Sequence, residues 1–357
     1  ILRQRLDEFT QQRPGVEIQV RIKALSGPGG LFDSLSTTSA AAPLAMPDIV
    51  ALPRELLEAA ALKGLLRPVN NLTDVLEAPD WYDYARQLSR LQDSIFGLPF
   101  AGDALVLVYR PEKIPSRPLD WAAALELRSA LVFPAADPLA LFSVAQYQAS
   151  GGEIRDAEGR PFLDVAQLSK LLDFYLKAEQ TELMPYWLTQ FQNDDQVWQA
   201  FLEERSDMVV TWSSRYLSTV ITTTNELPNL AFAPLPTPDG QPFTLASGWV
   251  WALASPNQGQ RILGLELAEF LCEADFLARW TEALGYLPPR SNALDGWLDV
   301  AIQPLAGQVL RSALLYPSTD ISTPLGAALQ DAVIRVLKEQ NDPVTAAQAA
   351  ADNLSGP

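Results

Sequence analysis

The sequence contains no histidine among its 357 residues, and its only cysteine is Cys272. Without histidine, the chain lacks the imidazole base of Ser-His-Asp and Cys-His nucleophile systems and the ligand of most zinc sites. One cysteine can form no internal disulfide, and its apolar, helically spaced surroundings, LAEFLCEADFLARW, predict a buried core residue. These absences exclude the commonest catalytic triads and leave the cellular compartment open.

Long apolar runs and an excess of positive charge are also missing. No segment approaches the roughly 18 consecutive apolar residues of a membrane-spanning helix. The 26 Lys and Arg residues are outnumbered by 43 Asp and Glu residues, which leaves a formal net charge of −17. An acidic chain lacks the basic face needed to bind nucleic acid or an anionic membrane surface. We therefore expect neither of these partners, and we expect no metal ion and no cofactor.

The length and composition indicate a folded protein of about two domains. At roughly 150 residues per domain, 357 residues suffice for two, and 48% hydrophobic residues are typical of folded chains. The first residues, ILRQRLDEFTQQRPG, already follow a helical pattern. An export signal or lipid anchor would therefore lie upstream of residue 1.

Helical and strand-like segments alternate along the chain. Up to residue 63 the predicted order is helix, strand 16–22, helix, strand 48–52 and helix. The second of these strands, DIVAL, is continuously apolar, as in a buried parallel sheet. Further strands are expected at 104–109, 130–133, 207–212, 230–233 and 244–253. The pattern restarts after the proline-rich segment 111–120, which predicts an α/β fold of two lobes with a ligand cleft at strand ends.

Seven segments carry a more specific signal through their order in the chain. They are FTQQRPGVEIQV, AAPLAMPDIVALPRELLEAAALKGLLRPVN, FGLPFAGDALVLVYRPEKI, ASGG, FLEERSDMVVTWSSRYL, FAPLPTPDGQPFTLASGWVWALAS and LGYLPPRSNAL. In this order they resemble the family 1 extracellular solute-binding proteins of ABC importers, the maltodextrin-binding-protein-like group. The resemblance covers nearly the whole chain, except that the family's first strand should precede residue 1.

The resemblance implies a two-lobe periplasmic-binding-protein fold, type II-like, with three inter-lobe crossovers and a ligand cleft. Lobe one would comprise residues 1–109 and 252–295, and lobe two residues 114–247 and 305–357. The implied function is capture of a small solute by hinge closure and its delivery to the membrane permease of an ABC transporter. The protein would be a monomer outside the cytoplasm, in the periplasm or at the cell surface, without catalytic activity.

Aromatic side chains beside polar ones are what a sugar site needs, because sugar rings stack on Trp or Tyr while sugar hydroxyls bind polar groups. Trp212 ends a predicted strand and lies in a ligand-lining segment by resemblance, with core packing as the alternative. Trp249 and Trp251 share one strand face; the family position favours Trp249 for the cleft, whereas Trp251 suits packing equally well. The other candidate ligand-binding residues, each of which could instead cap, pair or pack locally, are Arg54, Glu55, Asp103, Asp137, Tyr186, Trp187, Arg290 and Tyr316.

A second class of function stays open, namely a carbohydrate-active enzyme such as a glycosidase that uses two carboxylates. The adjacent pair Asp194 and Asp195 is a poor candidate, because neighbouring side chains diverge on a helix, and we expect a solvated face there. Abundant aromatic residues and few basic ones favour a neutral, ring-bearing solute, most simply a sugar or oligosaccharide.

Overall fold

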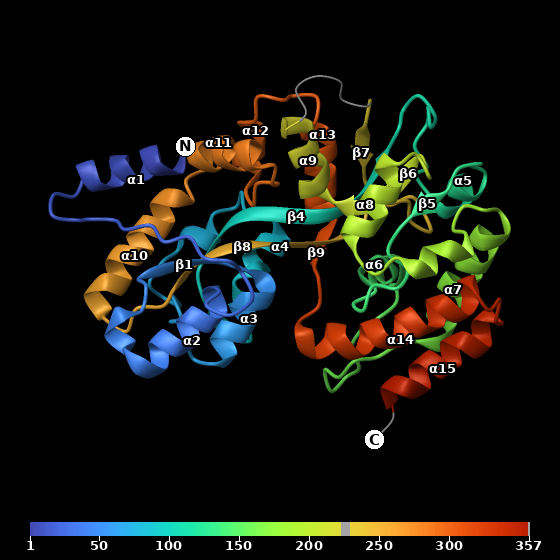
Figure 1. The fold of residues 1–357 in the computed structure, drawn as a ribbon, viewed down its shortest axis with the longest axis horizontal. Helices are drawn as coiled ribbons and strands as arrows, with labels where there is room; N and C mark the ends of the chain where they lie inside the picture. Colours follow the sequence, from blue (N-terminus) through green and yellow to red (C-terminus); the bar gives the residue numbers. More distant parts are fainter. Residues whose placement is uncertain (223–228, 356–357) are drawn as a thin grey trace. The chain divides into compact units, whose positions relative to one another are not determined.

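The computed structural model describes residues 1–222 and 229–355, and these divide into two units (Figure 1). Unit 1 comprises Ile1–Asp103 and Ser247–Gly307, and unit 2 comprises Ala104–Ala246 and Gln308–Pro357. Each unit has its own helices and strands, and the chain alternates between them. The lobe limits expected from the sequence stay a prediction.

Unit 1 is built on the antiparallel pair of β1 (Ile49–Pro53) with β8 (Thr244–Leu253), in register from Ile49 opposite Leu253 to Pro53 opposite Trp249. Strand β4 (Leu98–Tyr109) neighbours β8. Gly248 permits this, because a Cβ there would lie 2.3 Å from the carbonyl oxygen of Ala101. The predicted strand at 48–52 is therefore present, but its antiparallel pairing corrects the parallel sheet that its apolar run indicated.

Helices and one small hairpin complete unit 1. They are α1 (Leu2–Gln11), α2 (Leu31–Ala41), α3 (Arg54–Leu62), α4 (Asp83–Leu88), β2 (Arg90–Leu91), β3 (Ser94–Ile95), α10 (Gln258–Leu271), α11 (Ala274–Leu284), α12 (Ser291–Asp295) and the start of α13 (Gln303–Ser312). Short 3-10 turns lie at Pro43–Ala45 and Val75–Glu77. The α1/α10 core cluster, which consists of Leu6, Phe9, Leu267, Leu271 and Phe276, joins α1 to α10 and α11.

The strand predicted at 16–22 is absent as a strand. Residues 16–24 follow α1 as a chain without helical or strand pairing. Val16 and Ile18 pack against the α1/α10 core cluster, whereas the side chains of Val20 and Ile22 are 61% and 94% exposed. The alternation of apolar and polar residues is thus that of a strand, but a strand needs a neighbour, and no described residue pairs with the backbone of 17–23.

We expect the backbone amides of residues 17–23 to exchange with solvent far faster than those of β4. Exchange is slow only where an amide is hydrogen-bonded in a structure that opens rarely. Hydrogen exchange followed by mass spectrometry should find 17–23 fully exchanged within seconds, with β4 peptides as the protected control. Slow exchange of this segment in dilute protein would contradict the open backbone described above.

Unit 2 surrounds the second half of β4. This strand pairs antiparallel with β6 (Met208–Trp212) and with β7 (Ala231–Ala233), while β5 (Leu131–Val132) runs parallel to β6. β9 (Ala313–Leu315) adds a parallel pairing to the start of β8. The mixed sheet with helices around it confirms the predicted α/β class.

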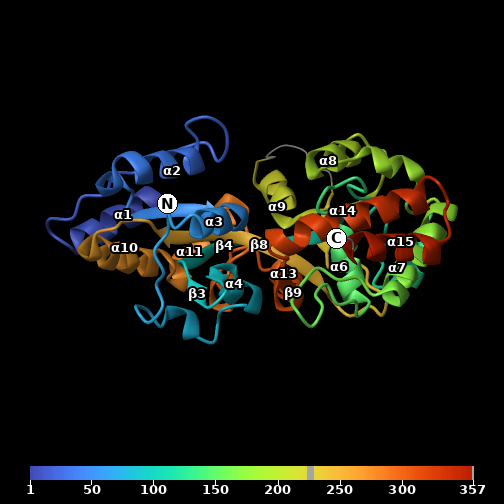
Figure 2. The same cartoon turned by 90° about the horizontal axis from the view of Figure 1, so that it is seen from below.

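The helices of unit 2 form its outer layers. They are α5 (Trp121–Leu125), α6 (Leu141–Ala149), α7 (Val165–Gln180), α8 (Asp194–Leu202), α9 (Ser213–Thr222), α14 (Thr319–Leu337) and α15 (Pro343–Ser355), with a 3-10 turn at Tyr186–Gln190. Helix α15 packs against both α7 and α14, as Figure 2 also shows. None of the described helices is both long and apolar enough to cross a membrane.

Candidate functional site

Unit 1 gathers aromatic and acidic side chains where β4 and β8 pass each other. Trp249 on β8 is half-buried, its ring centre lies 6.4 Å from that of Phe100 on β4, and its indole N–H donates a hydrogen bond to the hydroxyl of Tyr286. Asp103 is half-buried at the far end of the unit 1 part of β4, and its charge acts on Tyr286 and on Tyr84. The side chains of Trp249, Tyr286, Asp103 and Tyr84 form the polar-aromatic cluster of unit 1.

Both tyrosines of the polar-aromatic cluster are held as neutral phenols. Burial raises the pKa of Tyr286, and the negative charge of Asp103 raises it further. Burial raises the pKa of Tyr84 well above its ordinary value, with Tyr82 and Asp103 adding to the effect. A neutral phenol can donate one hydrogen bond and accept others. The Asp103 carboxylate can only accept hydrogen bonds. Together with the two phenols, the cluster can therefore both donate hydrogen bonds to a ligand's hydroxyl groups and accept hydrogen bonds from them.

Tyr84 carries an open hydrogen-bonding position. Its side chain is 1% exposed, and its hydroxyl has no hydrogen-bond partner among the described residues. A Cβ on Gly102 would lie 1.9 Å from this hydroxyl oxygen, so the phenol approaches the backbone of β4 only because residue 102 is glycine. A buried polar group without a partner is costly, and such groups concentrate at functional sites.

We expect Gly102→Ala to lower the free energy of unfolding by about 1–3 kcal/mol, because the new methyl group must displace Tyr84. Adding Tyr84→Phe removes the clashing oxygen and should recover part of the loss. Chemical denaturation of the two single variants and the double variant measures this coupling. Equal losses for Gly102→Ala with and without the phenol would mean that the clash lies elsewhere, for example at the Leu287 carbonyl 3.3 Å away.

Trp251 packs in the core of unit 1. Its ring stacks on Phe100 with centres 4.3 Å apart and planes at 23°, and it packs against the α1/α10 core cluster. Its indole nitrogen is buried and has no hydrogen-bond partner among the described residues. Of the two tryptophans that share this strand face, only Trp249 belongs to the polar-aromatic cluster.

Both candidate arginines are occupied by partners inside unit 1. Arg54 is 5% exposed, donates to the carbonyl oxygens of Leu88 and Arg90 at 2.8 and 2.9 Å, and pairs with Glu58 at 2.9 Å. The result is a buried ion pair that fixes the start of α3 against the end of α4. These bonds disfavour a ligand contact, although that contact stays a prediction.

Arg290 is held by a two-pronged ion pair. Its guanidinium binds both carboxylate oxygens of Asp80 at 2.8 and 2.9 Å and donates to the Cys272 carbonyl at 2.9 Å. It also lies 5.0 Å from the ring centre of Trp81. Such a two-pronged pair is strong and geometrically specific. Arg290 therefore ties the loop before α12 to the segment around residue 80. The acidic candidate Glu55 has a different environment from the two arginines, because it is exposed in the first turn of α3.

In unit 2, Trp212 ends β6 opposite Leu105 and is half-buried. The turn that follows it is fixed from both sides. Thr211 donates to Asp194 at 2.5 Å, and the Nε atom of Arg215 donates to the other oxygen of Asp194 at 3.0 Å. Arg215 also pairs with Asp195. Asp194 thus anchors the segment that carries Trp212, which corrects the solvated face expected for Asp194, whereas the side chain of Asp195 is 79% exposed, as expected.

The remaining unit 2 candidates have local partners. Asp137 accepts backbone hydrogen bonds from Leu139 and Leu141 at 3.0 and 3.1 Å, while burial raises its pKa against the lowering effect of these bonds. Trp187 meets Phe191 edge-on at 5.7 Å and lies under the Arg205 guanidinium at 5.0 Å. The two other candidates are Tyr186, which is 56% exposed, and Tyr316, which is 6% exposed.

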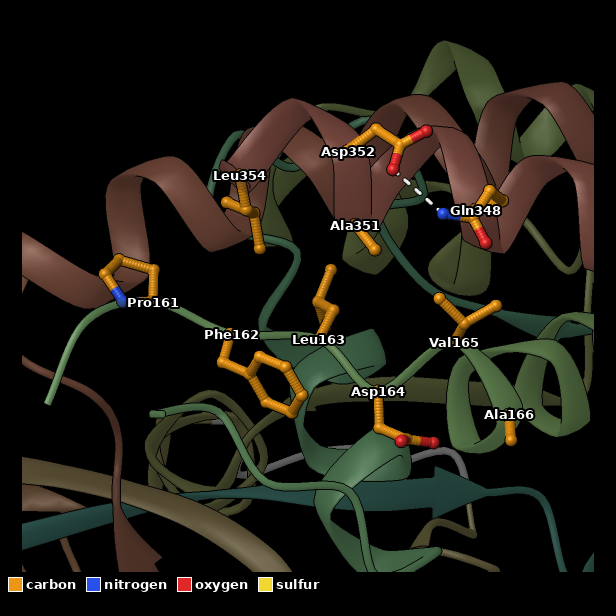
Figure 3. Close-up of a pocket in the computed structure, with 10 residues that line it drawn as sticks. All are labelled: Pro161, Phe162, Leu163, Asp164, Val165, Ala166, Gln348, Ala351, Asp352 and Leu354. Atoms are coloured by element: carbon orange, nitrogen blue, oxygen red, sulfur yellow. Dashed lines mark hydrogen bonds between the residues drawn. The ribbon is translucent and has the colours of Figure 1, made fainter. Parts of the chain in front are cut away.

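A groove of about 460 Å³ lies elsewhere in unit 2 (Figure 3). It is lined by residues 161–166 before and at the start of α7, and by Gln348, Ala351, Asp352 and Leu354 of α15. Leu163 and Val165 point toward α15 in Figure 3, and the side chain of Gln348 donates to Asp352 one turn further along α15 at 2.8 Å. None of the candidate ligand-binding residues lines this groove.

The single cysteine and the acidic residues complete the inventory of reactive groups. Cys272 is buried, its thiol donates to the Pro99 carbonyl at 3.4 Å, and burial raises its pKa. Within residues 1–222 and 229–355, no three Cys, Asp or Glu side chains are grouped as metal ligands. Sequence reasoning missed Tyr84 and Tyr286, because only the folding of unit 1 brings them to Asp103.

Solved structures of sugar-binding proteins share this fold. The sugar-binding protein MalE from Xanthomonas citri aligns with a TM-score of 0.80 at 18% identity, covering 99% of this chain and 94% of that one. The cyclic α-maltosyl-1,6-maltose-binding protein of Arthrobacter globiformis aligns with a TM-score of 0.77 at 16% identity, covering 99% and 94%. Maltose-bound MalE3 of T. maritima aligns with a TM-score of 0.72 at 19% identity, covering 99% and 95%. These matches confirm the predicted two-lobe binding-protein fold.

A family comparison identifies the chain more directly. No match is found among curated proteins. The family model described as bacterial extracellular solute-binding protein matches residues 4–304, which is most of the chain. This match confirms the family resemblance that the order of the seven sequence segments indicated. The chain belongs to the bacterial extracellular solute-binding proteins.

Proposed function

We propose that this protein is the substrate-binding component of an ABC importer that captures a neutral sugar or oligosaccharide. The observation that carries the proposal is the polar-aromatic cluster of unit 1. Trp249 offers an aromatic face, Tyr84 and Tyr286 offer neutral hydroxyls, and Asp103 offers a carboxylate. Sugars present C–H faces and hydroxyls, which are the complementary groups.

The charge of the candidate residues supports a neutral ligand over an anion. The two cations among them, Arg54 and Arg290, are paired with Glu58 and Asp80. Freeing either arginine to bind an anion would leave a carboxylate buried without its partner, which is strongly unfavourable. The formal net charge of −17 also opposes the approach of an anion.

The proposed contacts come from both units. From unit 1 we propose Trp249, Asp103, Tyr84 and Tyr286, with Glu55 at the margin. From unit 2 we propose Trp212 as the main stacking residue, with further contacts from Asp137, Tyr186, Trp187 and Tyr316. Hinge closure on the solute would then be driven by contacts that only the closed state makes.

The similar structures support a sugar in particular. One is described as bound with maltose, another as complexed with maltotetraose, and a third is an ABC transporter solute-binding protein bound with α-D-tagatose. We propose that this protein likewise binds its solute without converting it, acts outside the cytoplasm as a monomer, and passes the solute to a membrane permease.

A ligand screen tests the proposal. Thermal shift and calorimetry with glucose, tagatose, maltose and maltotetraose should give at least one saturable ligand, while citrate and glutamate give none. Binding to the folded state raises the melting temperature by mass action. Chromatography of the recovered ligand should return it intact. Turnover abolished by one acidic substitution would instead establish the glycosidase alternative, and saturable binding of only the anions would overturn the sugar assignment.

A further inference from the structure

Trp212 lies between two residues that are each bonded to a different element of unit 2. The hydroxyl of Thr211, which is 1% exposed, donates to one carboxylate oxygen of Asp194 on α8 at 2.5 Å. The hydroxyl of Ser213, which is also 1% exposed, accepts a hydrogen bond from the backbone N–H of Ala104 on β4 at 3.2 Å. The backbone is therefore fixed on both sides of Trp212, while the indole itself is half-buried.

The carboxylate of Asp194 bridges the end of β6 and the first turn of α9. Its second oxygen accepts from the Nε atom of Arg215 at 3.0 Å, and such a charge-assisted bond is stronger than one between neutral groups. Because neighbouring side chains of a strand point to opposite faces, Thr211 faces α8 and Trp212 points away from it. The carboxylate can therefore restrain Trp212 from the opposite face of the strand, where it does not compete with a ligand for the indole.

The start of α8 is itself held in place. The side chain of Asn193 accepts a hydrogen bond from the backbone N–H of Gln196 at 3.1 Å, and the side chain of Gln196 accepts one from the backbone N–H of Gln192 at 2.6 Å. This reciprocal pair is a variant of the capping box, which stabilises a helix N-terminus. Further along the same helix, Phe201 is fully buried. Asp194 therefore forms its two bonds from a rigid position.

We propose that Asp194 is a positioning residue, which holds the indole of Trp212 in the orientation that stacks on the solute. This role rests on the proposed function, in which Trp212 is the main stacking residue of unit 2. An indole that is already oriented loses no rotamer freedom when the solute binds, and such preorganisation raises affinity. Asp195 provides a matched comparison, because it pairs with the same Arg215 although its side chain is 79% exposed. An exposed ion pair contributes little, so Asp195 should not be needed for the orientation of Trp212.

Fluorine NMR of protein labelled with fluorotryptophan measures the orientation without a ligand. The nine tryptophans give nine resonances, and Trp212→Phe identifies that of Trp212 by its absence. In Asp194→Ala and in the nearly isosteric Thr211→Val, this resonance should move towards its position in unfolded protein, because the indole then samples several rotamers. In Asp195→Ala and in Thr211→Ser, which retains the hydroxyl, the resonance should stay in place.

Two results of this experiment would overturn the proposal. One is an unmoved Trp212 resonance in Asp194→Ala or, should that variant not fold, in Thr211→Val. The other is an equal movement in Asp195→Ala, which would assign the orientation to Arg215 as a whole and not to the carboxylate of Asp194.

Titration with maltotetraose, and with the other three sugars of the screen, links the orientation to binding. Asp194→Ala should raise the dissociation constant at least about fivefold, whereas Asp195→Ala should change it less than about twofold. In protein that already carries Trp212→Ala, Asp194→Ala should add less than about a twofold further loss, because a positioning residue acts through the residue that it positions. A full loss in that background would overturn the proposal. Absence of binding to every sugar by the natural protein would overturn the proposed function, and the fluorine resonances would still decide whether Asp194 orients Trp212.

Discussion

Trp249→Ala is expected to weaken sugar binding by tenfold or more while unit 1 stays folded. The substitution removes the stacking face and also the indole N–H that orients the Tyr286 hydroxyl. An aromatic stacking contact contributes about 0.5–1.5 kcal/mol beyond area burial, and a hydrogen bond contributes about as much again. Together these are equivalent to about a tenfold change or more in the dissociation constant. Calorimetry with the best sugar of the screen measures the change.

Trp251→Ala is the matched control for this prediction, because Trp251 lies on the same strand face but packs in the core. It should lower the free energy of unfolding by about 3–5 kcal/mol and leave the affinity of the protein that still folds close to normal. Phe at position 249 should retain the stacking and lose the hydrogen bond, giving an intermediate affinity. Normal binding by Trp249→Ala would place the solute away from the polar-aromatic cluster.

Arg290→Gln is expected to lower the free energy of unfolding by about 3–5 kcal/mol. It removes the partner of Asp80, whose side chain is 9% exposed, and leaves a buried carboxylate uncompensated. Adding Asp80→Asn removes that charge, so the double variant should be more stable than Arg290→Gln alone. Urea denaturation of the three variants measures both effects.

The control for Arg290 is Lys177→Gln, which breaks an exposed pair with Asp173 and should change stability by less than about 0.5 kcal/mol. Sugar affinity separates the two roles that the sequence left open for Arg290. A positioning residue changes stability and leaves the affinity of the folded protein largely unchanged. A loss of affinity without a loss of stability would make Arg290 a ligand contact after all.

Short-range features of the sequence explain much of the local structure. Asp164, Asn193 and Asn257 each cap a helix by accepting a hydrogen bond from a backbone N–H three residues on, as their side chains allow. Most helices and strands could likewise be predicted from the spacing of apolar residues, because this spacing is also a local property of the sequence. Segment 16–22 has the period of a strand but no neighbouring strand among the described residues, and neither the neighbour of a strand nor its direction is encoded locally.

Much of the candidate site could not be predicted from local patterns, because its residues contact partners that are far away in the sequence. The partner of Arg290 is 210 residues away, so its role as a clamp could not be read from the LPPRSN segment alone. Tyr84 and Tyr286 meet Asp103 only after β4, α4 and the loop after α11 have packed together. Trp249 and Asp103 could be predicted because the family resemblance marks their segments, and their contact with a ligand stays a prediction.

The burial of Cys272 also means that a dye can be attached to this protein at one chosen position. Because its thiol is buried, hydrogen-bonded to the Pro99 carbonyl and kept protonated by a raised pKa, we expect the native cysteine not to react with maleimide dyes. A cysteine placed at Tyr186, where the native side chain is 56% exposed beside Trp187, would then be the only reactive thiol. A dye attached there would report solute capture as a change in fluorescence, and the natural protein would need no other alteration.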